Sequence, residues 1–173
     1  MTKISILGNS GSGKSSLAVL LSKELSIPVF HVDKILWKPH WIRAPEDEFT
    51  EKHNKILKMD HWILDGVGYK STYRHRFEKS DIIIYLDIPV EICFQRAKRR
   101  MVEDKARPNP YVTENCPYVG SDELQMQVID SYQQEIRPII LELLNEFRTL
   151  KQVIILDENF KLEDLIELLK NNN

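Results

Sequence analysis

The residues of this chain that are best placed to do chemistry are the eight from Gly8 to Ser15, which read Gly-Asn-Ser-Gly-Ser-Gly-Lys-Ser. They fit the pattern G-x-x-x-x-G-K followed by Ser or Thr, with an apolar run before them and a helical pattern after them. In such a loop the backbone N–H groups form a nest for anions, and glycine keeps side chains out of the way. The sequence therefore predicts a binding loop for the phosphates of a nucleoside triphosphate.

Two side chains of this loop have separate expected roles. The Lys14 ammonium is expected to reach the β- and γ-phosphates, and the Ser15 hydroxyl is expected to ligate Mg²⁺. ATP and Mg²⁺ are the expected cofactors, although no base-reading motif decides between ATP and GTP. The residues expected to bind the nucleotide are Gly8, Asn9, Ser10, Gly11, Ser12, Gly13, Lys14, Ser15, Ser16 and Arg96.

Two aspartates follow later apolar runs, Asp33 after residues 28–32 and Asp65 after residues 62–64. Ligands of parallel sheets bind at the carboxyl ends of the strands, so both carboxylates are expected beside the phosphate loop. Asp65 is expected to hold a water of Mg²⁺, and Asp33 to orient or deprotonate an acceptor hydroxyl. The alternative for each is a solvated turn or cap residue.

Six of the twelve residues at positions 96–107 are basic. Arg96 and Arg100 are four apart and share one helix face, where they are expected to stabilise the charge on a transferring phosphoryl group. Lys98 and Arg99 are expected on a solvated face. The expected catalytic residues are Lys14, Arg96, Arg100 and Asp33.

Aromatic and basic side chains cluster from the end of the second apolar run onward: His31, Trp37, His40, Trp41 and Arg43. They predict either an acceptor pocket with aromatic walls or a satellite hydrophobic cluster. The spacing of the two histidines matches no ordinary zinc-ligand pattern.

The elements that must position these residues alternate along the chain. Apolar runs predict strands at 3–7, 28–32, 62–64, 81–86 and 153–156, and helical periodicity predicts helices at 14–25, 45–59, 89–102, 122–150 and 162–169. Such alternation indicates an α/β fold with a parallel sheet covered on both faces. We expect one domain over residues 1–173, with an acceptor-side segment at 33–60 and a lid at 103–121.

One of these predicted helices, at 122–150, carries an apolar stripe and a proline. The stripe has a four-residue spacing that starts at Leu124 and Val128, and Pro138 is expected to kink the helix.

Composition removes several other classes. The 173 residues carry 24 Lys and Arg against 26 Asp and Glu, so a polyanionic partner such as bulk DNA is not required. Two cysteines without close spacing support neither a disulfide framework nor a Cys-rich zinc site. There is no apolar run long enough to span a bilayer and no signal-peptide pattern, so a cytoplasmic location is expected. The oligomeric state is not predicted.

Three stretches together resemble the adenylate-kinase-like P-loop kinases over nearly the whole chain: Ile63-Leu64-Asp65-Gly66, residues 80–89, and Arg96-x₃-Arg100. Within that family, His31-Val32-Asp33, Leu36-Trp37-Lys38 and Trp41 resemble the FlaR-type branch, labelled "DNA topology modulation". The resemblance implies a three-layer P-loop NTPase fold with a five-stranded sheet of order 2-3-1-4-5 and a lid over the cleft.

For individual residues, the resemblance implies that Arg96 stacks on adenine, that Arg100 touches phosphates, and that residues 157–160 lie near the base. Arg107 and Arg137 are candidates for the arginines of the lid.

The chain also departs from this family. Leu36 stands where the monophosphate kinases carry an arginine, and residues 66–69 replace their Gly-Phe-Pro-Arg run. AMP is therefore not the expected acceptor.

The leading hypothesis is a Mg-ATP-dependent phosphotransferase whose partners are a nucleoside triphosphate and an unidentified small acceptor. The absence of an N-K-x-D element late in the chain disfavours a GTPase. Two alternatives stay open: a nucleotide-binding regulatory protein that influences DNA topology or gene expression without kinase activity, and a nucleotide hydrolase. Nucleic acid is the less favoured partner, and no membrane partner is expected.

Overall fold

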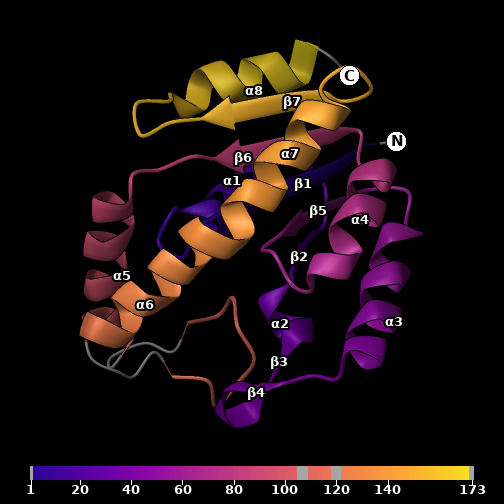
Figure 1. Ribbon diagram of the computed structural model, residues 1–173. Coiled ribbons are helices and arrows are strands. Elements are labelled where there is room, and N and C mark those ends of the chain that lie inside the picture. The colour runs from indigo at the N-terminus through magenta and orange to yellow at the C-terminus, as the bar shows by residue number, and fades with distance from the viewer. Residues whose placement is uncertain (1, 105–108, 118–121, 172–173) are drawn as a thin grey trace.

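Five parallel strands lie at the centre of the computed structural model, which describes residues 2–104, 109–117 and 122–171 (Figure 1). They are β1 (Lys3–Gly8), β2 (Val29–His31), β5 (Trp62–Asp65), β6 (Ile82–Leu86) and β7 (Gln152–Leu156). Their order across the sheet is β2-β5-β1-β6-β7, which confirms the predicted order with β1 in the middle.

Helices cover both faces of this sheet. They are α1 (Lys14–Leu25), α3 (Glu46–Leu57), α4 (Tyr73–Lys79), α5 (Val90–Asp104), α6 (Asp122–Ser131), α7 (Arg137–Phe147) and α8 (Leu162–Asn171). Within the described part of the chain, no helix is long and apolar enough to cross a membrane.

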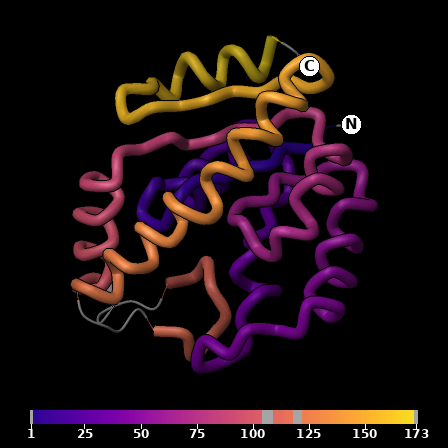
Figure 2. Tube along the Cα trace, viewed as in Figure 1, coloured from indigo at the N-terminus to yellow at the C-terminus, as the bar shows by residue number. Residues whose placement is uncertain are grey.

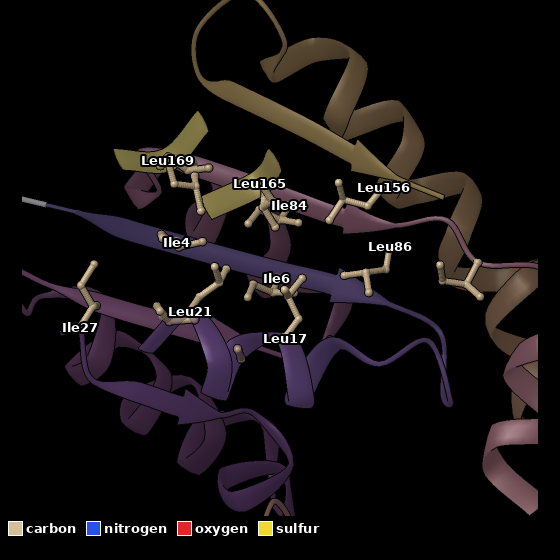
Figure 3. Close-up of a cluster of buried hydrophobic side chains, with 14 of the residues drawn as sticks. Ile4, Ile6, Leu17, Leu21, Ile27, Ile84, Leu86, Leu156, Leu165 and Leu169 are labelled. Atoms are coloured by element: carbon tan, nitrogen blue, oxygen red, sulfur yellow. The ribbon is translucent and has the colours of Figure 1, made fainter. Parts of the chain in front are cut away.

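The alternation of side chains along β1 divides the core into two layers. Ile4 and Ile6 pack with leucines of α1 and α8 on one face, as Figure 3 shows. Leu7 points to the other face, where it packs with side chains of α4 and α7. In Figure 1, α7 crosses this second face diagonally. Because successive side chains of a strand point to opposite faces, one short apolar strand serves both layers.

The register of the strands brings their carboxyl ends together. Ile6 of β1 pairs with Asp65 of β5, and Asp65 pairs with His31 of β2. On the other side of β1, Gly8 pairs with Leu86. The residues that follow these strands therefore meet at one edge of the sheet, as the sequence predicts.

Several short elements were not predicted. One turn of helix, α2 (Asp33–Leu36), follows β2, and a small hairpin of β3 (Trp37–Lys38) and β4 (Ile42–Arg43) comes next, with a 3-10 turn at Pro39–Trp41 between its strands. Another 3-10 turn, at Lys70–Thr72, leads into α4. Segments this short carry too few residues to show a periodicity in sequence.

The predicted helix at 122–150 is α6, a π-helical turn at Tyr132–Ile136, and α7. The interruption lies just before Pro138, which has no N–H to donate into the preceding turn. The predicted stripe is wrong at its first two positions, because Leu124 and Val128 are 47% and 49% exposed, whereas Tyr132, Ile140 and Leu144 further along it are buried. A strict four-residue spacing rotates about 40° per step around an α-helix, so it drifts off the buried face.

One buried polar side chain, His53 of α3, lies against the hydrophobic cluster beside β5, which includes Phe49 and Leu57 of α3 and Trp62 and Leu64 of β5. Its ring stacks on Phe49 at a centroid distance of 5.5 Å, and its Nδ1 has no hydrogen-bond partner among the described residues. Burial lowers the pKa of His53 to about 3, and the Arg76 guanidinium adds to the effect. The neutral imidazole is therefore the form that folds.

This burial predicts a loss of stability in mild acid. The folded-state pKa lies below the ordinary value of 6.5, so the unfolded chain takes up the proton first and stability falls as the pH drops below 6.5. Between about pH 7 and pH 5, His53 alone should remove about 2 kcal/mol from the free energy of unfolding. Urea titrations at both pH values should show this slope, and His53→Phe should flatten it. Substitution of the exposed His75 by Ala should leave it in place; a slope unchanged in His53→Phe would contradict the assignment.

Candidate active site

The phosphate loop, residues 8–15, joins the end of β1 to the start of α1. Gly13 caps α1 in the left-handed region at φ 97°, and Gly11 has φ 78°. A Cβ at Gly11 would lie only 2.1 Å from the backbone oxygen of Cys93, near the start of α5. Glycine at this position is therefore required both by the backbone angle and by the close approach of α5.

The Lys14 ammonium is held across this loop. Its Nζ donates a hydrogen bond of 3.2 Å to the backbone oxygen of Asn9. Burial lowers the pKa of Lys14, while the nearby carboxylates of Asp33 and Asp65 oppose that shift and Arg100 adds to it. The two aspartates and two cations thus share one small region at the mouth of the loop.

Asp65 is buried at the end of β5 and is contacted from two sides. The Ser15 hydroxyl donates to its Oδ2 at 2.5 Å, and the Nδ1 of His31 is hydrogen-bonded to its Oδ1. A hydroxyl beside a carboxylate supplies the hard oxygen ligands that Mg²⁺ prefers, and Mg²⁺ usually takes only one or two carboxylates together with substrate phosphates and water. The residues present therefore fit the metal that the phosphate loop implies.

Asp33, the first residue of α2, is the second carboxylate of the region. Burial raises its pKa, and the Lys14 ammonium opposes the shift. The indole of Trp37 lies near this carboxylate and also favours its charged form. Asp33 therefore lies between the phosphate loop and the aromatic segment that follows β2.

The basic residues of α5 divide into two groups. Arg96 donates a hydrogen bond of 3.1 Å to the backbone oxygen of Ser12 in the loop. Arg100 lies close enough to Lys14 and Asp33 to influence the pKa of both. The side chains expected on the solvated face are ion-paired instead: Lys98 with Asp122 at 2.5 Å, and Arg99 with Glu103 at 3.3 Å.

The two candidate lid arginines have different outcomes. Arg107, with part of the lid expected at 103–121, lies outside the described residues. Arg137 follows the π-helical turn and forms a two-pronged ion pair with Asp87, at 3.0 and 2.8 Å. Asp87 comes directly after β6, so this pair lies at the edge of the sheet where the strands end.

Sequence reasoning missed Arg76, a fully buried cation of α4 beneath the end of β5. Its Nε donates to Ser5 Oγ at 2.8 Å, its Nη1 donates to the backbone oxygen of Gly66 at 2.6 Å, and its Nη2 donates to that of Leu64. Burial lowers its pKa to about 10. These bonds hold the backbone on both sides of Asp65. The one signal in sequence is the position of Arg76 between Tyr73 and Phe77, which face the core.

Residues 109–117, the described part of the segment expected to form a lid, pack against the β3–β4 hairpin, as Figures 1 and 2 show below the sheet. Thr113 Oγ1 donates to the backbone oxygen of Trp37 at 2.6 Å, and Cys116 Sγ donates to that of Lys38 at 3.2 Å. Near its start, the Tyr111 ring lies 4.9 Å from the ring of His31, measured between centroids. The segments expected to form the lid and the acceptor side are therefore joined to each other by these contacts.

The aromatic residues expected to form an acceptor pocket or a satellite cluster do not all meet. Trp37 and Trp41 make an edge-on contact, with ring centroids 5.5 Å apart, and Trp37 also packs on the buried cluster beside β5. The Arg43 guanidinium lies 4.0 Å from the centre of the Tyr69 ring. The described residues place no three His, Cys, Asp or Glu side chains around a possible metal position, so His31 and His40 do not form a zinc cage.

Comparison of the sequence with known proteins gives partial matches. No protein-family model matches the chain. It is 34% identical over 109 residues to the uncharacterized protein YqaC of Bacillus subtilis (strain 168), a match that covers 56% of this chain and 55% of YqaC. It is 24% identical over 124 residues to the shikimate kinase of Aquifex aeolicus (strain VF5), covering 61% of this chain and 69% of that enzyme. The chain thus aligns with about half of the first of these relatives.

Comparison of the structure covers the full length. A shikimate kinase from Acinetobacter baumannii, solved with shikimate, superposes with a TM-score of 0.62 at 20% identity, over 100% of this chain and 96% of that one. A deoxyadenosine kinase from M. mycoides, solved with dATP, gives a TM-score of 0.58 at 14% identity, over 99% and 98% of the two chains. The fold of this chain is therefore that of the P-loop kinases.

The contact between Gly11 and α5 predicts an unequal effect of two alanine substitutions. Gly11→Ala should destabilise the ligand-free protein by about 2 kcal/mol or more, because the new methyl group meets backbone atoms that cannot rotate away. Gly13→Ala should cost only about 1 kcal/mol from its left-handed backbone, because the nearest atom to its Cβ is a flexible Arg96 nitrogen at 3.8 Å. Thermal unfolding of both variants measures the difference. Equal losses would show that backbone angle alone accounts for Gly11.

Proposed function

We propose that this chain is a Mg²⁺- and ATP-dependent phosphotransferase that acts on a hydroxyl group of a small molecule. The observation that carries this proposal is the convergence of Lys14, the Ser15–Asp65 pair and Asp33 at the end of the sheet. A phosphate-binding loop alone fits any user of nucleoside triphosphates. A half-buried carboxylate beside the loop lysine, that of Asp33, adds a place for a second substrate.

The chemistry that this arrangement supports is an in-line displacement. The acceptor oxygen attacks the γ-phosphorus of ATP, the bond from that phosphorus to the β,γ-bridging oxygen breaks, and ADP leaves with the electron pair. Asp33 takes the proton of the acceptor hydroxyl, and its raised pKa makes it a stronger base than an exposed aspartate. Lys14, with Arg96 and Arg100, stabilises the charge on the phosphoryl oxygens.

Mg²⁺ supplies charge neutralisation on the β- and γ-phosphates when it is bound, and Ser15 and Asp65 would hold it, Asp65 through water. The shikimate kinases and the deoxyadenosine kinase with similar folds are named for two quite different acceptors. These names support a small hydroxyl compound as the acceptor class and leave its identity to experiment.

The basic residues of α5 favour the enzyme over a DNA-binding regulator. Arg96 is bonded to the phosphate loop, and Lys98 and Arg99 are paired with acids. A surface that binds DNA through phosphates would present such side chains together toward solvent. That the chain is related to the FlaR-type branch is a separate proposal, which rests on the short aromatic segment from His31 to Trp41.

The test is a screen for ADP release with ATP, Mg²⁺ and a panel of nucleosides, nucleotides, sugars and small hydroxy acids. At least one acceptor should accelerate ADP release, and Lys14→Ala should lower that rate by about 10²-fold or more, because the phosphoryl charge loses the cation of the phosphate loop. Lys55→Ala, on the exposed face of α3, serves as the matched control and should retain the rate. Acceptor-dependent turnover that survives in Lys14→Ala would overturn the assignment, and turnover that no acceptor accelerates would favour a hydrolase.

Asp33→Asn should separate binding from catalysis. We expect kcat to fall by about 10²-fold while the Kd of ATP changes less than about threefold, because the amide cannot take the acceptor proton. The unsubstituted enzyme should lose activity as the pH falls through the raised pKa of Asp33, at a higher pH than the ordinary value of 3.8 would give. This loss of activity at low pH, the acid limb of the pH profile, should be missing in Asp33→Asn. It should be present in the control Asp47→Asn, which changes an exposed residue in the first turn of α3. An acid limb that persists in Asp33→Asn assigns the base elsewhere.

A further inference from the structure

His31 lies at the edge of the site, yet the proposed reaction gives it no role. It is the last residue of β2, and the parallel register sets it directly opposite Asp65. Its Nδ1 is hydrogen-bonded to one oxygen of the Asp65 carboxylate, while the Ser15 hydroxyl donates to the other at 2.5 Å. Both oxygens of the carboxylate are thereby held in position by separate elements of the fold.

The chemistry of the pair defines which atom carries the proton. A carboxylate can only accept hydrogen bonds, so the Nδ1 of His31 must be the donor. A carboxylate with a single partner can rotate about its last bond, whereas donors on both oxygens fix its plane. Outer residues that orient a metal-binding carboxylate in this way typically change metal affinity by about 10- to 100-fold when they are removed.

The surroundings of His31 fix its ring in turn. The side chain is only 10% exposed, and the Tyr111 ring packs against it at a tilt, with centroids 4.9 Å apart. The next residue along the chain is tied to the same strand end, because Val32 N donates to the backbone oxygen of Asp65 at 2.8 Å. The imidazole therefore has little freedom to turn away from the carboxylate.

We propose that His31 is a positioning residue for the metal: its Nδ1–H orients the Asp65 carboxylate so that it can hold the water shell of nucleotide-bound Mg²⁺. This inference rests on the proposed function, because it takes nucleotide and Mg²⁺ as the ligands. It assigns His31 to the binding of the metal and not to proton transfer or to contact with the acceptor.

The test measures how much Mg²⁺ tightens the binding of an ATP analogue whose γ-phosphoryl group cannot be transferred. Binding is measured by calorimetry in EDTA and again in saturating Mg²⁺. Three substitutions are compared: His31→Leu, His31→Gln and His31→Asn. Asparagine keeps an N–H on the atom next to Cγ, where Nδ1 stands, whereas glutamine carries its amide one bond further out. His75→Leu, on the exposed surface of α4, is the control.

We expect His31→Leu and His31→Gln to reduce the Mg²⁺-dependent gain in affinity about tenfold or more. Their affinity in EDTA should change less than about threefold, since the hydrogen bond of the His31 ring goes to the Asp65 carboxylate and not to the phosphate loop. His31→Asn and His75→Leu should keep the gain within about threefold. If His31→Leu does not fold, the comparison of His31→Gln with His31→Asn still tests the proposal, because both of these variants carry a polar amide.

A full Mg²⁺ gain in His31→Gln would overturn the proposal, as would an equal loss in His31→Asn. An equal loss of affinity with and without Mg²⁺ would also overturn it, because it would assign His31 to packing alone. The two proposals fail differently. If the unsubstituted chain binds nucleotide with a Mg²⁺ gain but phosphorylates no acceptor, only the proposed function falls; if it binds no nucleotide, both do.

Discussion

The buried carboxylate of Asp65 is the point on which the candidate site depends. It ends the strand beside β1, and it accepts hydrogen bonds from Ser15 of α1 and His31 of β2. Beneath it, Arg76 binds the backbone oxygens of the residues on either side. One side chain thus fixes the relative positions of the phosphate loop helix and two strands. A shift in any of these elements changes the place where metal and phosphate would be bound.

Charge is balanced around this point within a small volume. The positive charges of Lys14 and Arg100 are offset by the negative charges of Asp33 and Asp65 at the mouth of the loop. Removing a charge from water is expensive, so Lys14 and Asp33, whose pKa values burial shifts toward the neutral form, depend on the opposite charges nearby to stay ionised. The same balance is visible in two pKa values. Burial lowers the pKa of Lys14 while the carboxylates raise it, and burial raises the pKa of Asp33 while the Lys14 ammonium lowers it. Incoming phosphate would meet cations that are already in place.

The parts of the fold that could be predicted are those that short stretches of consecutive residues specify. The phosphate loop, the helix after it and the order of five strands follow from a local motif, from apolar runs and from a family resemblance. The stripe from Leu124 failed at its first two positions because a regular spacing of four does not follow an α-helix, which has 3.6 residues per turn. The short helix α4 was missed because seven residues show little periodicity.

The contacts that complete the site could not be predicted, because they join residues far apart in sequence. In the sequence alone, nothing distinguishes Arg76 clearly from a surface arginine; only the fold shows that it is buried beneath β5. The pairing of His31 with Asp65 spans 34 positions, and that of Trp37 with Thr113 spans 76. Nothing in the residue types of these partners specifies the match. Only the register of the strands and the path of the chain across the sheet create it.

The approach of Gly11 to α5 has a consequence for how related chains can vary. The clash that a side chain at position 11 would cause is with the backbone oxygen of Cys93, an atom that every amino acid carries. The side chain at position 93 is constrained instead by the core cluster that packs around its thiol. Residue 11 is therefore restricted to glycine whatever stands at position 93. In an alignment, this contact would show as an invariant column with no covarying partner, invisible to methods that infer contacts from correlated change.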